Sequence, residues 1–135
     1  MYKCKHFEIY ELVPKELSRF PESKLWLLFD DRALKTLDML RDEFGTITVN
    51  DWAFDGKLTQ CGFRTNDNLG AKFSQHRYGR AFDCHFQNAS VEEVRKLCKE
   101  KVFKCFEHIT AIEDGVSWFH FDVRNHDGDL LIFNP

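Results

Sequence analysis

Three side chains in two short segments of the chain could together bind a metal ion. His76 and Asp83 stand seven residues apart, and Gly79 between them permits a backbone turn that a residue with a Cβ would resist. His120 supplies a second imidazole in the segment 118–122. Two imidazoles and one carboxylate leave a zinc ion one open position, which can hold a water whose pKa the metal lowers to about 7. The three residues therefore predict a catalytic zinc site.

The segment around His120 has the composition of a strand over residues 117–123. Side chains two positions apart on a strand share a face, so Trp118, His120 and Asp122 are expected to point the same way. These residue types suit a cleft better than a core. We therefore expect Trp118 to line a substrate-binding cleft and Asp122 to orient either a histidine ligand or Arg124.

A family resemblance rests on both segments. The stretch from Ser74 to Asp83 matches the pattern SxHxxGxAxD, which resembles the signature of the D-alanyl-D-alanine carboxypeptidase and hedgehog-type zinc peptidases. Trp118-x-His120, followed by Asp122 and Arg124, is similar to the second motif of bacterial and phage members of that family. The first pattern is specific, and the resemblance covers about half of the chain, roughly residues 62–124.

The resemblance implies roles for individual residues. His76, Asp83 and His120 would bind the Zn²⁺ cofactor, although a mixed nitrogen and oxygen site can also take manganese, cobalt or nickel. Ser74 would help to bind the substrate. Arg64 resembles an arginine that these enzymes place near the developing oxyanion, and positive charge there stabilises a tetrahedral intermediate.

The general base is where this chain departs from the family pattern. Many members have Asp or Glu three residues before the last histidine ligand, and here that position is Ser117. The nearest carboxylates upstream are Glu113 and Asp114, at a distance where hedgehog-type members also carry an acidic residue. Both remain candidate bases, with Glu113 favoured, and the alternative is that both belong only to a hairpin turn.

The resemblance implies a zinc metallopeptidase that hydrolyses peptide bonds of bacterial peptidoglycan. The reaction would be that of a D-alanyl-D-alanine carboxypeptidase or of an endopeptidase that cuts the L-alanyl-D-glutamate bond. The alternatives are a non-catalytic zinc-binding module of the same fold and a virion structural domain in which zinc only stabilises a loop. If the protein is an enzyme, a chelator should abolish its hydrolysis of peptides, whereas both alternatives predict bound zinc and no hydrolysis.

Composition sets limits on partners and location. The 135 residues carry a net charge of −3 with scattered Lys and Arg, so no nucleic-acid partner is expected. The N-terminus lacks the apolar stretch of a signal peptide, and the longest apolar run, 25–29, is too short for a membrane span. Five cysteines without a CxxC pair indicate reduced thiols. We expect a monomer made in the cytoplasm that reaches the cell wall as phage lysis or virion proteins do.

The elements that must position the site form an α+β pattern of early helices and late strands, expected to make one zinc peptidase-like domain over residues 1–135. The expected fold is hedgehog- or DD-peptidase-like, with helices packed on one face of a small antiparallel sheet. Hairpin turns are expected at 113–115 and 125–128. The expected helices cover residues 14–20, 25–44 and 90–100, and the expected strands cover residues 6–10, 46–49, 81–86, 110–112, 117–123 and 130–133.

Overall fold

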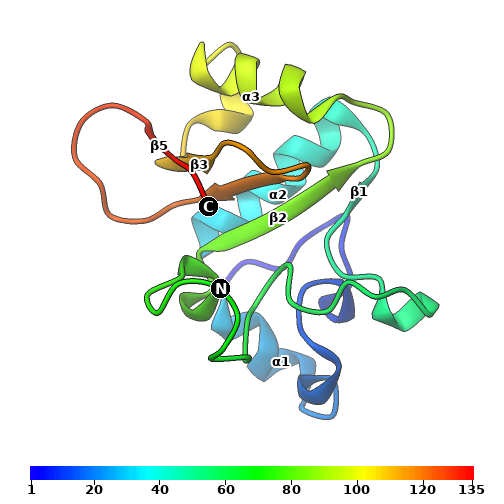
Figure 1. The fold of residues 1–135 in the computed structure, drawn as a ribbon. Coiled ribbons are helices and arrows are strands. Elements are labelled where there is room, and N and C mark those ends of the chain that lie inside the picture. Colours follow the sequence, from blue (N-terminus) through cyan, green and yellow to red (C-terminus); the bar gives the residue numbers. More distant parts are fainter.

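The computed structural model describes all residues 1–135 and has an α+β fold, as the sequence predicts (Figure 1). Five strands form one sheet in the order β1-β2-β4-β3-β5. None of the helices combines the length and the apolar character needed to cross a membrane. The strands are β1 (Ile47–Thr48), β2 (Ala81–Phe86), β3 (Ala111–Glu113), β4 (Phe119–Asp122) and β5 (Leu131–Phe133).

The pairing of β2 with β4 gives the sheet one apolar and one polar face. Asp83 lies opposite His120 in the antiparallel register, and Phe82 lies opposite Phe121. Successive side chains of a strand point to opposite faces, so the two phenylalanines enter the core while Asp83 and His120 share the other face. Strand pairing therefore brings together two of the three expected metal ligands.

The expectation of an all-antiparallel sheet is wrong at β5. This strand pairs with β3 in parallel, with Ala111 opposite Leu131 and Glu113 opposite Phe133. The turn expected at 125–128 would have paired the last strand with β4, but the inner edge of β3 already occupies that side of β4. The chain after β4 instead crosses to the outer edge of β3, as the red segment in Figure 1 shows.

The expected single helix over 25–44 is also wrong. The chain forms α1 (Glu22–Leu25) and a short 3-10 helix (Trp26–Leu28), becomes extended at Phe29 and then starts α2 (Asp31–Phe44). Asp30 is the N-cap of α2, and its side chain accepts a hydrogen bond from the Arg32 backbone N–H. Gly45 ends α2 with a positive φ of 84°.

The break before α2 is stabilised by the loop that carries His76. The backbone N–H of Asp30 donates to the Gly79 carbonyl at 2.9 Å. Gly79 has a φ of +67°, and a Cβ at this position would lie 1.9 Å from the Leu28 carbonyl oxygen. This close approach requires glycine, and it fixes the loop before β2 against the helical layer.

The N-terminal strand expected over 6–10 is absent, and a 3-10 helix, Ile9–Glu11, occurs there instead. The carboxylate of Asp38 on α2 accepts hydrogen bonds from the backbone N–H groups of Lys5 and His6. A side chain thus satisfies donors that a neighbouring strand would otherwise have to pair. The short helix expected over 14–20 is confirmed as a 3-10 helix, Lys15–Leu17.

The helices bury their apolar side chains against the sheet in one core. Figure 1 shows α2 behind β2, and Leu34, Leu37 and Leu40 of α2 are fully buried. The helix expected over 90–100 is confirmed as α3 (Val91–Lys99), whose N-cap is Ser90. Its residues Val94 and Cys98 join the same core.

Candidate active site

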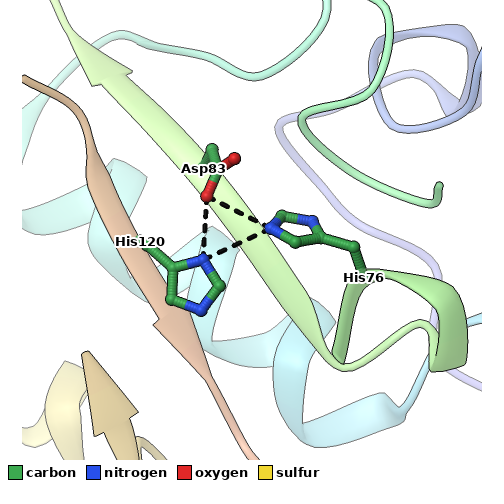
Figure 2. A group of neighbouring side chains, drawn as sticks. All are labelled: His76, Asp83 and His120. Carbon is green, nitrogen blue, oxygen red and sulfur yellow. Dashed lines mark hydrogen bonds and ion pairs between the residues drawn. The ribbon is translucent and has the colours of Figure 1, made fainter. Parts of the chain in front are cut away.

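His76, Asp83 and His120 converge on the polar face of β2 and β4, where Figure 2 shows their side chains directed toward one another. Asp83 Oδ1 lies 3.2 Å from His76 Nε2 and 2.8 Å from His120 Nδ1. The two ring nitrogens are 3.3 Å apart. Zinc bonds of about 2.0–2.1 Å in tetrahedral geometry place their donors about 3.3 Å apart, so these three atoms fit such an ion.

Hydrogen bonds on the far side of each imidazole determine which nitrogen can bind a metal. His76 Nδ1 donates to the Gly62 carbonyl at 2.9 Å, and His120 Nε2 donates to Asp122 Oδ2 at 3.0 Å. His76 Nε2 and His120 Nδ1 are therefore the nitrogens left to act as ligands. A divalent cation would satisfy both of them and the Asp83 oxygen together.

Burial and the neighbouring charges shift the pKa values of all three side chains of the cluster. Burial works against a charged His120, but the hydrogen bonds and negative charges of Asp122 and Asp83 outweigh it and raise its pKa to about 9. Burial would raise the pKa of Asp83, yet His76 and His120 hold it well below its usual value. Burial lowers the pKa of His76. Without a metal, His120 therefore carries a proton at neutral pH, and zinc would replace it.

Asp122 connects the cluster to Arg124. Its carboxylate is fully buried and accepts hydrogen bonds from His120 Nε2 at 3.0 Å and from Arg124 Nε at 2.7 Å. Burial alone would raise the pKa of Asp122, but the bonds from Arg124 and His120 lower it. The sequence left open whether Asp122 contacts a ligand or Arg124, and the structure shows that it contacts both.

The structure separates the two candidate bases. Glu113 lines the cavity beside the metal cluster, with Oε2 at 4.0 Å from His120 Nδ1, and burial raises its pKa. Asp114 does not line that cavity, because its carboxylate pairs with Lys99 of α3 at 3.1 Å. Of the two carboxylates, only that of Glu113 therefore faces the cluster.

The cluster lies in a cavity of about 710 Å³ that is lined by three more of the expected site residues. Ser74 and Trp118 line it, and the indole Nε1 of Trp118 is buried without a partner. Arg64 extends into it with Nη2 at 3.5 Å from Asp83 Oδ2, and burial lowers its pKa. An arginine keeps its charge despite such a shift, so Arg64 presents a cation beside the candidate metal ligands.

Several residues of the site had no signal that we recognised in the sequence. Phe133 lies edge-on to His120, with ring centroids 5.4 Å apart, because β5 pairs in parallel with β3. Gly62 supplies the carbonyl that orients His76, and a Cβ there would lie 2.2 Å from the Leu12 carbonyl oxygen. Gly62 could be read in the sequence, but its close approach to the Leu12 carbonyl oxygen could not.

Comparison with known proteins places this geometry in context. The model of the peptidase M15 family matches residues 28–122, a range that contains all three candidate ligands and Glu113. No curated protein and no solved structure matches the chain.

Proposed function

The chain belongs to the peptidase M15 family, and from that premise we propose that it is a zinc-dependent peptidase acting on bacterial peptidoglycan. The observation that supports this most directly is the buried group of His76, Asp83 and His120, with Glu113 beside it in one cavity. Two imidazoles and one carboxylate leave a coordination position open for catalysis.

The side chains around the cluster could carry out peptide hydrolysis. Zinc, when bound, would act as a Lewis acid and lower the pKa of a water molecule. Glu113 would accept a proton from the attacking water and deliver it to the leaving amine, a role suited to a carboxyl whose pKa is raised by burial. Arg64 would donate hydrogen bonds to the oxyanion that develops on the scissile carbonyl.

The cavity also has groups suited to a short peptide. The free indole N–H of Trp118 and the hydroxyl of Ser74 offer polar contacts, while exposed Leu69 and Phe73 give the rim an apolar surface. A wall peptide that contains D-amino acids would be cleaved either at its D-alanyl-D-alanine end or at its L-alanyl-D-glutamate bond. Delivery to the wall through a phage lysis pathway or a virion remains part of this proposal.

The proposal is tested with purified protein, peptidoglycan and synthetic stem peptides, with products identified by mass spectrometry. We expect hydrolysis with zinc, its loss with a chelator and its recovery when zinc is restored. Release of D-alanine would identify a carboxypeptidase, and a new D-glutamate N-terminus would identify an endopeptidase. Equal product with and without the chelator, or none with added zinc, would contradict the proposal.

A matched pair of variants tests the base. Glu113→Gln should lower kcat by a factor of about 100 to 10,000, the usual contribution of general acid–base catalysis. Asp114→Asn is the control, since Asp114 pairs with Lys99 outside the cavity, and it should keep near wild-type activity. Bound zinc with no hydrolysis in any of these proteins would favour the non-catalytic module, for which Ser117 at the usual acid position is the supporting observation.

A further inference from the structure

Arg95 is a buried cation on α3 that binds the segment joining β3 to β4. Only 3% of its side chain is exposed, and a buried guanidinium is costly unless its N–H groups are paired. Its Nε donates to the Glu113 carbonyl at 3.2 Å, and its Nη2 donates to the carbonyls of Val116 and Trp118, the latter at 2.7 Å. One side chain thus holds three carbonyl groups of the segment 113–118.

Two carboxylates, those of Glu92 and Asp114, lie beside the Arg95 guanidinium. Glu92, one turn earlier on α3, accepts a hydrogen bond from Nη1. Asp114 Oδ1 lies 3.8 Å from Nε, and its other oxygen accepts from Lys99 at 3.1 Å. These contacts keep Asp114 on the side of the helix and leave Glu113 on the side of the cavity.

Strand pairing does not by itself fix Glu113 relative to His120. The ladder between β3 and β4 ends at the pair Ile112 and Phe121, one residue before Glu113. Beyond that pair, β5 borders Glu113 on one side, and on the other side the chain is held by Arg95. The two ends of the held segment, Glu113 and Trp118, both line the cavity.

We propose that Arg95 is a positioning residue that keeps Glu113 at the distance from the metal cluster that hydrolysis requires. This inference rests on the proposed function. The ligands themselves are positioned by other groups, namely the Gly62 carbonyl for His76 and Asp122 for His120. Loss of Arg95 should therefore disturb the base and leave the metal site intact.

Arg95→Met removes every donor and keeps a long apolar stem. It should lower kcat about 10- to 100-fold, because a shift of the base by about 1 Å can cost that much, while KM and zinc affinity change less than about threefold. Arg95→Lys should recover part of the loss, since an ammonium can still reach some of the carbonyls. Lys96→Met is the control, because Lys96 is exposed on the same helix and has no hydrogen bond or ion pair with the segment 113–118, so kcat should stay unchanged.

Two measurements separate positioning from general damage. In a Glu113→Gln background, Arg95→Met should change the residual rate by less than about twofold, and an undiminished loss there would overturn the proposal. Hydrogen exchange of zinc-loaded protein should be faster in the segment 113–118 of Arg95→Met than in wild type, with no change in β2.

The exchange experiment needs no substrate, so it also separates the two hypotheses. If wild-type protein hydrolyses no wall peptide, the proposed function fails, and faster exchange in 113–118 still supports the role of Arg95 in holding this segment. Unchanged exchange overturns that role whatever the activity. Should Arg95→Met fail to fold, Arg95→Lys carries both measurements, with intermediate losses expected.

Discussion

Replacing Asp122 by asparagine tests how the site fixes the ligand nitrogen of His120. The Asp122 carboxylate accepts from both His120 Nε2 and Arg124. An amide has one acceptor oxygen and one donor nitrogen, so it cannot accept from both neighbours as the carboxylate does. If the amide N–H faces His120, the ring takes the tautomer with the proton on Nδ1, and Nδ1 can then no longer bind zinc.

The expected loss follows from the role of such outer contacts. Removing the group that orients a metal-binding histidine costs about 10- to 100-fold in metal affinity, which corresponds to roughly 1.4–2.7 kcal/mol. We expect Asp122→Asn to fall in this range and not to abolish binding, because His76 and Asp83 keep their own contacts.

Zinc affinity is measured by competition with a chromogenic chelator at fixed pH, alongside the zinc-induced rise in melting temperature. Asp127→Asn is the control, since Asp127 is exposed in the loop after β4 and should bind zinc as the wild type does. An Asp122→Asn protein that is folded and binds zinc within about twofold of wild type would refute the tautomer argument.

Four further predictions concern the same site. Because the pKa of His120 is raised to about 9, zinc affinity should fall about tenfold for each pH unit below 9, and competition with a chelator at several pH values would reveal or exclude this trend. For the same reason, the metal-free protein should lose stability as the pH rises from 6.5 through 9. Arg64→Met should lower kcat about 100- to 1,000-fold, with Arg64→Lys less affected, and equal rates in all three proteins would remove the oxyanion role. Gly62→Ala should destabilise the protein by about 1–3 kcal/mol in denaturant unfolding, since its Cβ would meet the Leu12 carbonyl oxygen, and an unchanged midpoint would contradict this.

The grouping of the three candidate metal ligands could be predicted from the sequence because their types and spacing are local. His76 and Asp83 belong to one short motif, and His120 lies in a strand whose alternation was visible. The choice between Glu113 and Asp114 could not be made in this way. It depends on two residues of α3, since Arg95 binds the backbone carbonyl of Glu113 and Lys99 pairs with the Asp114 carboxylate, and no local pattern reveals how this helix packs.

The errors in the fold have the same physical origin. The helix break at Phe29 depends on the contact between Asp30 and Gly79, nearly fifty residues later in the chain. The missing strand at 6–10 depends on Asp38, whose carboxylate takes the backbone donors. In both places the local sequence favours one structure, and a contact with a distant residue imposes another.

The register of β2 against β4 has a consequence for how the protein reaches its native state. A slip of one residue would turn Asp83 toward the phenylalanines and away from His120, so a misaligned sheet would have no place for the ion. Zinc present during refolding would then stabilise only correctly aligned chains. Zinc would thereby favour the correct strand register during folding, before any catalysis.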